Sequence, residues 1–151
     1  MPTNLYGPGD NFDLESSHVI PAMIRKFHEA KINDNSTVKL WGSGLPMREF
    51  LHVDDLAEAV VYALENRLDE HLYNVGTGSD LTIKDLALLV QSIIGHKGEI
   101  YWETNYPDGT PRKLMDTGKL NTQGWKSTIN LEKGISKTYS WFLDNQSKIR
   151  F

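Results

Sequence analysis

The chain has 151 residues, of which 39% are hydrophobic and 24% charged, and its formal net charge is −4. This length allows one domain with its own core, and the composition is that of a globular protein, not a disordered one. The acidic balance argues against a general nucleic-acid binder, and the lack of cysteine excludes disulfides, thiolate metal sites and a cysteine nucleophile within the chain.

The first ten residues, MPTNLYGPGD, have neither the basic start nor the apolar core of a signal peptide. No apolar run is long enough to cross a bilayer. We therefore expect a cytoplasmic protein that does not insert into membranes.

Residues 2–17 are rich in Pro, Gly, Asn, Asp and Ser, which predicts a loop. Irregular segments of this length generally connect two ordered elements. We therefore expect a strand upstream of Pro2 that is not part of this chain.

A helix is predicted directly after this loop. Ser16 and Ser17 are of the type that caps helix N-termini, and Pro21 suits the first turn. The apolar stripe of the helix comprises Val19, Ile20, Met23, Ile24 and Phe27.

The most informative stretch is residues 41–60, WGSGLPMREFLHVDDLAEAV. Strands are predicted over residues 38–42 and 48–53, joined by a tight turn that two glycines allow. The turn lies between Trp41 and Arg48, so a flat ring and a forked cation are held close together. Such a pair suits a nucleotide, although the spacing alone fits a buried Trp and a surface Arg equally well.

A second helix is predicted to follow Asp54 and Asp55, whose carboxylates suit a helix N-terminus, and to end near Asn66. Apolar residues repeat at helical spacing along it: Leu56, Ala57, Val60, Ala63 and Leu64.

The remaining predicted elements are a strand over residues 71–75, a GTGSD turn, a helix capped by Thr82 and stopped by Gly95, a strand over 99–103, a loop around 107–113, a short helix over 116–120 and a last helix capped by Asn130. Five aromatic residues are assigned to the core and not to a ligand: Trp102, Trp125, Tyr139, Trp141 and Phe142.

Because helices and strands alternate, the fold class is α/β. The strands are short and few, so they do not form a complete doubly wound sheet. We expect edge pieces of a Rossmann-like parallel sheet together with a small substrate-binding domain.

Two features of nicotinamide enzymes are absent from this chain, namely a glycine fingerprint between a strand and a helix and a Tyr-x-x-x-Lys pair. His18, at the mouth of a helix after a glycine-rich loop, is the one candidate acid–base residue. From the residues alone, a polar side chain in the first turn of a helix is the more common interpretation.

Four runs of sequence carry a family resemblance, in the same order along the chain. Residues 48–55, REFLHVDD, resemble extended short-chain dehydrogenase/reductases that act on nucleotide sugars. Three further runs are similar to the GDP-L-fucose synthases, which are GDP-4-keto-6-deoxymannose 3,5-epimerase/4-reductases: residues 2–12 (PTNLYGPGDNF), 17–30 (SHVIPAMIRKFHEA) and 107–116 (PDGTPRKLMD). The likeness covers nearly the whole chain but only the second half of such an enzyme.

The resemblance implies that residues 1–151 are a single C-terminal substrate-binding domain and that the N-terminal NADP-binding Rossmann domain is absent from this chain. NADP(H) would be bound mainly by that missing half, which would also carry the Ser/Tyr/Lys group and a catalytic cysteine. The substrate would be a GDP-sugar, and the full-length enzyme would be a homodimer. This chain alone would be incomplete as a catalyst.

The resemblance also implies roles at the N-terminal end of the chain. His18 would donate protons during epimerisation at C3 and C5 and would contact the cofactor. Pro2, Thr3, Asn4 and Leu5 match the segment that lies against the nicotinamide of NADP, although a strand-end turn is the alternative.

Five residues match substrate contacts of the family: Lys26, Trp41, Arg48, Asp108 and Lys113. Arg48 and Lys113 would offset the charge of the pyrophosphate, and Asp108 would accept hydrogen bonds from guanine or ribose. The alternatives are that Lys26 lies on a solvated helix face, that Asp108 shapes a Pro-Asp-Gly turn, and that Arg112 takes the place of Lys113.

The remaining histidines and acids show no metal-ligand spacing, so no metal site is expected. Two other functions remain open at this point. One is a different nucleotide-sugar epimerase or reductase of the same superfamily, and the other is a non-catalytic nucleotide-sugar-binding module.

Overall fold

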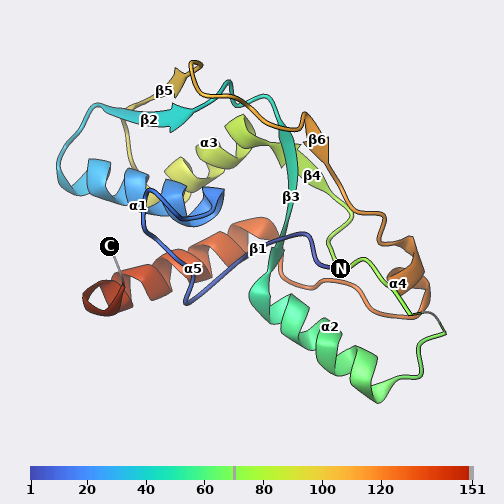
Figure 1. Cartoon of the computed structure of the whole chain (residues 1–151). Coiled ribbons are helices and arrows are strands. Elements are labelled where there is room, and N and C mark those ends of the chain that lie inside the picture. Colours follow the sequence, from blue (N-terminus) through green and yellow to red (C-terminus); the bar gives the residue numbers. More distant parts are fainter. Residues whose placement is uncertain (70, 150–151) are drawn as a thin grey trace.

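The structure is a computed structural model that describes residues 1–69 and 71–149. Short strands alternate with longer helices, which confirms the α/β fold class (Figure 1). The elements are, in order, β1 (Asn4–Tyr6), α1 (Val19–Ile32), β2 (Thr37–Trp41), β3 (Met47–His52), α2 (Val53–Glu65), β4 (Asp80–Thr82), α3 (Ile83–Ile94), β5 (Glu99–Glu103), β6 (Arg112–Lys113), α4 (Gly118–Thr122), α5 (Leu131–Asn145) and the 3₁₀ helix η1 (Gln146–Lys148).

β3 is the centre of the larger sheet. β1 pairs in parallel with its C-terminal half, whereas β6 pairs in parallel and β4 antiparallel with its N-terminal half. β2 and β5 form a separate parallel pair. The predicted strand–turn–strand is therefore a corner between two sheets, because β2 and β3 pair with different partners and not with each other.

The main core lies between α1, α3 and α5 and the strands that they cover (Figure 1). The predicted stripe of α1 is confirmed, since Ile20, Met23, Ile24 and Phe27 are buried. A smaller core lies under α2 and contains Leu51, Ala59, Leu120 and Trp125. Side chains alternate across β3, so Phe50 packs in the main core and Leu51 in the smaller one.

Two predicted N-caps are confirmed. The Thr82 hydroxyl accepts a hydrogen bond from Asp85 N at 3.0 Å, and Asn130 Oδ1 accepts one from Lys133 N at 2.9 Å. Gly95 ends α3 in the left-handed conformation, with φ of 79°.

The predicted serine caps of α1 are wrong. The helix begins after His18, whose side chain makes no capping hydrogen bond. Ser16 donates from both its N–H and its hydroxyl to Asp13 Oδ1, at 2.9 and 2.8 Å, so it belongs to a turn that precedes the helix. The Ser16 hydroxyl, predicted to cap α1, thus bonds to Asp13 instead.

Several short strands differ from the prediction. β1, β4 and β6 lie in segments predicted to be loop or turn, and the strand predicted over residues 71–75 is reduced to a single bridge between Val75 and Pro2. Each of β1, β4 and β6 has only two or three residues and forms because β3 offers it backbone partners. Pairing with a distant strand leaves no local periodicity in the sequence.

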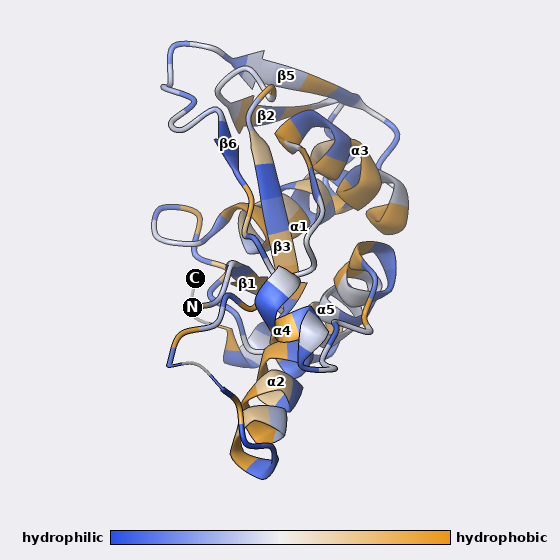
Figure 2. Ribbon diagram, turned by 90° about the vertical axis from the view of Figure 1, so that its right-hand side faces the viewer, coloured by the Kyte–Doolittle hydropathy of each residue, from blue (hydrophilic) through white to orange (hydrophobic). Residues whose placement is uncertain are grey.

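The apolar stripe of α2 faces solvent. Val60 is 52% exposed and Leu64 is 82% exposed, and the buried residues of the helix are Asp55 and Ala59. The Asp55 carboxylate sets this rotation, because it accepts hydrogen bonds from the backbone N–H groups of Thr128 and Ile129. Figure 2 shows α2 projecting from the body of the molecule, with much of its ribbon in the colour of hydrophobic residues.

We expect this exposed stripe to make the isolated chain self-associate. Sedimentation velocity over a range of concentrations should show oligomers that the double variant Val60→Glu/Leu64→Glu shifts to monomer. The matched control is Leu88→Glu, which introduces charge at a single exposed leucine on α3, 48% exposed, and should leave the association unchanged. A monodisperse wild-type monomer at all concentrations would contradict the expectation.

No helix in residues 1–69 and 71–149 combines the length and apolar character that a membrane-spanning segment requires.

Candidate functional site

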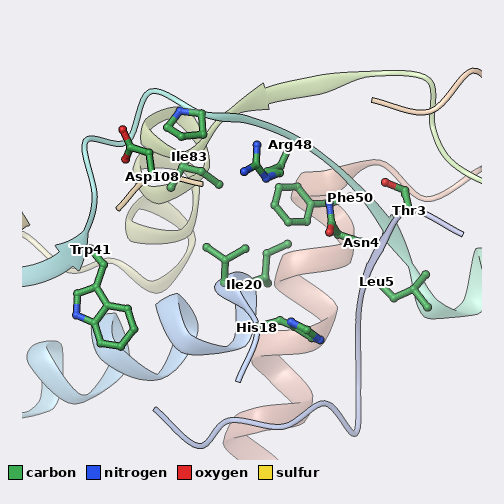
Figure 3. Close-up of a pocket in the computed structure, with 12 residues that line it drawn as sticks. Thr3, Asn4, Leu5, His18, Ile20, Trp41, Arg48, Phe50, Ile83 and Asp108 are labelled. Carbon is green, nitrogen blue, oxygen red and sulfur yellow. The ribbon is translucent and has the colours of Figure 1, made fainter. Parts of the chain in front are cut away.

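A cavity of about 550 Å³ opens where β1, the first turn of α1 and the β2–β3 corner meet (Figure 3). Predicted site residues from these three places, and one from the connection between β5 and β6, line it: Thr3, Asn4, Leu5, His18, Trp41, Arg48 and Asp108. Apolar residues complete its wall: Val19, Ile20, Pro46, Phe50 and Ile83. Segments far apart in the chain thus contribute one pocket with a few polar groups, the usual form of a small-molecule site.

β1 forms one wall of the cavity because it is tied firmly to β3. Asn4 lies opposite Phe50 in the parallel register. The Thr3 hydroxyl and the Asn4 amide both donate to the carbonyl oxygen of Glu49, at 3.3 and 2.8 Å. These two side chains therefore hold the strand in place. Pro2 pairs with Val75 and does not line the cavity.

His18 occupies the N-cap position of α1 and is exposed. Its imidazole lies on the wall between β1 and α1, as Figure 3 shows, and it also lines a smaller cavity formed with the Gly7–Asp10 turn. Because it does not cap its own helix, the imidazole is available to a ligand.

Trp41 lies at the end of β2 and is 54% exposed. Its indole stacks on Tyr106, with ring centroids 4.6 Å apart and an interplanar angle of 13°. The ammonium of Lys26 lies 5.3 Å from the indole centroid. Sequence reasoning missed Tyr106, because only the pairing of β2 with β5 brings its loop to Trp41.

Lys26 lies outside the main cavity but lines an adjoining one of about 240 Å³. Trp41, Val19 and Ile83 line both cavities, so the two share a wall. Burial lowers the pKa of Lys26, and the carboxylate of Glu103 opposes this effect. Its ammonium donates to the carbonyl oxygen of Lys39 at 3.0 Å.

Arg48 and Lys113 are neighbours across the β3–β6 pair. Side chains of paired residues project to the same face of a sheet, so Lys113 is placed beside Arg48, which lines the cavity. Lys113 is exposed and does not line the cavity itself. Arg112, the alternative to Lys113, forms an ion pair with Asp80 at 2.6 Å. Its guanidinium is therefore already paired within the protein.

Asp108 lines the cavity, but both of its carboxylate oxygens are engaged. Oδ1 accepts a hydrogen bond from Ser43 N and Oδ2 accepts one from Ser43 Oγ, each at 2.6 Å. These bonds lower the pKa of the Asp108 carboxyl. The geometry therefore shows Asp108 shaping the β2–β3 corner.

The described residues contain no group of three or more His, Asp or Glu side chains that could hold a metal ion. His28 and His96 are buried and hydrogen-bonded within the protein, with His28 Nδ1 3.1 Å from the Tyr139 hydroxyl and His96 Nε2 2.8 Å from the Asn35 carbonyl oxygen.

The chain is similar in sequence to curated GDP-L-fucose synthases. The chain is 55% identical over 145 residues to the putative GDP-L-fucose synthase 2 of Arabidopsis thaliana, covering 96% of this chain and 44% of that protein. It is 49% identical over 159 residues to the GDP-L-fucose synthase of Escherichia coli K12, covering 99% of this chain and 50% of that protein. The chain thus spans about half the length of the curated relatives it matches.

A solved GDP-L-fucose synthetase from Naegleria fowleri bound to NADP superposes with a TM-score of 0.92 at 28% identity, covering 99% of this chain and 47% of that one. The model of the NAD dependent epimerase/dehydratase family matches residues 1–76, half of the chain. That range includes β1, all of α1, the β2–β3 corner and α2. The chain therefore belongs to the NAD dependent epimerase/dehydratase family.

Proposed function

We propose that this chain is the substrate-binding portion of a GDP-L-fucose synthase, which converts GDP-4-dehydro-6-deoxy-D-mannose to GDP-L-fucose by 3,5-epimerisation and NADPH-dependent 4-reduction. One observation carries the proposal: Trp41, Arg48 and His18, from three separate elements, line a single cavity in a chain about half identical to curated synthases. An aromatic wall, a guanidinium and an imidazole are the groups that a nucleotide sugar undergoing proton transfer needs.

The arrangement of charge suggests how the substrate lies. The diphosphate binds at Arg48, because this guanidinium lines the cavity and Lys113 is its neighbour on β6. The nucleoside lies toward Trp41 and Lys26, where the adjoining apolar cavity begins. The sugar then extends toward His18 on the opposite wall.

The chemistry follows from the ketone at C4 of the substrate. A base removes the proton from C3 or C5 and leaves an enolate that the ketone stabilises. His18 as imidazolium then returns a proton to the opposite face of that carbon, which inverts it. The family resemblance implies that a cysteine is the base that removes this proton. The chain has no cysteine, so we assign that base to the NADP-binding half of the enzyme.

The residues present fit the nicotinamide end of a cofactor. Leu5 offers an apolar surface at the cavity, next to His18, on a strand that Thr3 and Asn4 hold in place. NADPH supplies the hydride for C4 when bound. Most of its binding is assigned to a separate NADP-binding half of the enzyme.

We propose that residues 1–151 act as one C-terminal domain that joins this NADP-binding half within a cytoplasmic homodimeric enzyme. The exposed part of the α2 stripe is the surface that we assign to the other half, because Val60 and Leu64 are 52% and 82% exposed. The chain alone is expected to be inactive.

The test uses an enzyme of full length whose second half is this chain, supplied with NADPH and either GDP-4-keto-6-deoxymannose or a UDP-4-keto-6-deoxy sugar. We expect turnover of the GDP-sugar only. Arg48→Ala should raise KM about 10- to 100-fold, because it removes charge-assisted hydrogen bonds to the diphosphate. Arg67→Ala, at an exposed arginine outside the cavity, is the control. Preference for the UDP-sugar would refute the proposal.

A further inference from the structure

The β2–β3 corner runs beside the connection from β5 to β6, which we call the β5–β6 loop (residues 104–111) (Figure 1). Every residue of this loop is exposed. Backbone hydrogen bonds tie both of its ends to the corner. Gly42 N donates to the carbonyl oxygen of Glu103 at 3.1 Å, and Met47 N donates to that of Pro111 at 2.8 Å.

Between these two ends, side chains attach the loop to the corner. The Asp108 carboxylate receives both hydrogen bonds that Ser43 donates, from its N–H and from its hydroxyl, each at 2.6 Å. We call this pair the Ser43–Asp108 clasp. The carboxylate also lies tightly against Gly42, where an added Cβ would be 2.4 Å from Asp108 Oδ1. Gly42 has a φ of 80°, a conformation that favours glycine, and a Cβ there would displace the Asp108 carboxylate.

The stack of Tyr106 on Trp41 is the second side-chain attachment, two residues before Asp108. Tyr106 covers one face of the indole and therefore limits how the ring can move. The loop thus reaches the cavity at two points: Tyr106 supports its aromatic wall and Asp108 holds the corner that carries that wall.

The clasp has a consequence for the cavity because β2 and β3 belong to different sheets. No ladder of backbone hydrogen bonds fixes the end of β2, which carries Trp41, relative to the start of β3, which carries Arg48. Their relative position depends on the corner. The start of α3 holds one side of it, because Lys84 N donates to the carbonyl oxygen of Gly44 and Ile83 N to that of Pro46, each at 2.9 Å. The clasp holds Ser43, on the other side, against the loop.

We propose that the Ser43–Asp108 clasp is a positioning device of the nucleotide site, and that Asp108 acts on the ligand through Ser43 and does not itself bind the base. The identity of the ligand rests on the proposed function, whereas the clasp does not. Tyr106 is a second positioning residue, which acts through Trp41.

The first experiment tests the clasp in this chain without any ligand. Amide exchange at Ser43, followed by NMR, should accelerate about tenfold or more in Asp108→Ala, because the N–H loses its acceptor. The matched control is Asp116→Ala, which removes another exposed aspartate that accepts a backbone hydrogen bond, from Gly118 N at 2.9 Å. It should leave Ser43 exchange unchanged. Equal exchange in wild type and Asp108→Ala would overturn the proposal.

The second experiment measures GDP affinity by titration of the Trp41 indole N–H signal. Ser43→Ala and Asp108→Asn should each weaken GDP binding about threefold to tenfold, and the double variant no more than either one, because both break the same pair. The preference for GDP over UDP should stay constant. If Asp108→Asn reduces that preference while Ser43→Ala leaves affinity unchanged, Asp108 reads the base and the clasp has no role.

The two proposals fail in different ways. Absence of any response to GDP in the wild-type chain would count against the proposed ligand. The exchange of the Ser43 amide would still decide whether the clasp exists.

Discussion

Replacement of His18 by Asn in an enzyme of full length is expected to slow proton exchange at C3 and C5 of the sugar by about 10²- to 10⁴-fold, the usual contribution of a positioned general acid. The imidazole is exposed and does not cap α1, so its loss should leave the fold intact. Deuterium uptake from D₂O into the GDP-keto sugar, measured by mass spectrometry without NADPH, isolates this step from the reduction.

The control for His18 is His71→Asn, which removes an exposed imidazole that does not line the cavity. Deuterium uptake should be unchanged in that variant. Circular dichroism and thermal unfolding of both variants check that the fold is retained. Normal uptake in His18→Asn would show that another group returns the proton, and the catalytic role proposed for His18 would have to be abandoned.

Replacement of Glu49 by Ala is expected to destabilise the chain by about 3–5 kcal/mol, because several buried donors lose their acceptor together. Glu49 is fully buried on β3. Its carboxylate accepts hydrogen bonds from Gly78 N at 2.7 Å, Met115 N at 2.9 Å and the Thr77 hydroxyl at 3.3 Å. It thus holds the segment that leads into β4 and the segment that follows β6 against β3. Urea unfolding followed by tryptophan fluorescence measures the free energy of unfolding.

Two further variants test whether the loss of stability comes from the missing hydrogen bonds or from any substitution on a strand. Glu99→Ala removes an exposed glutamate on β5 and should change the free energy of unfolding by less than about 0.5 kcal/mol. Gly76→Ala keeps the carboxylate but places a Cβ 2.3 Å from Glu49 Oε1, so it should also destabilise strongly. If Glu49→Ala unfolds at the same urea concentration as wild type, the carboxylate is not a structural link.

The glutamate also explains the GTGSD run, of which residues 76–79 are irregular as predicted and Asp80 begins β4. Its glycines do not cradle a phosphate. Gly76 leaves room for the Glu49 carboxylate, and Gly78 donates its N–H to that carboxylate. Sequence reasoning could not find these donors, because an isolated Glu in a strand gives no sign that it is buried among hydrogen-bond donors 28 or more residues away.

Much of the candidate site could be predicted, because its residues lie in contiguous runs that resemble a known family. His18, Trp41 and Arg48 were predicted in this way, and the structure brings them to one cavity. The partners of those residues could not be predicted. Tyr106 reaches Trp41, and Asp108 reaches Ser43, only because β5 lies beside β2.

The amino-acid sequence by itself determined the α/β class, the helices and most of their caps, because helical periodicity and capping are local and can be seen within a few turns of chain. Only the tertiary structure decided the short strands, the rotation of α2 and the joining of the cavity walls. β3 supplies the backbone partners for the strands, and Asp55 fixes the helix by bonding to Thr128 and Ile129. Such contacts depend on which distant groups meet in space, and they leave no pattern in the sequence around either residue.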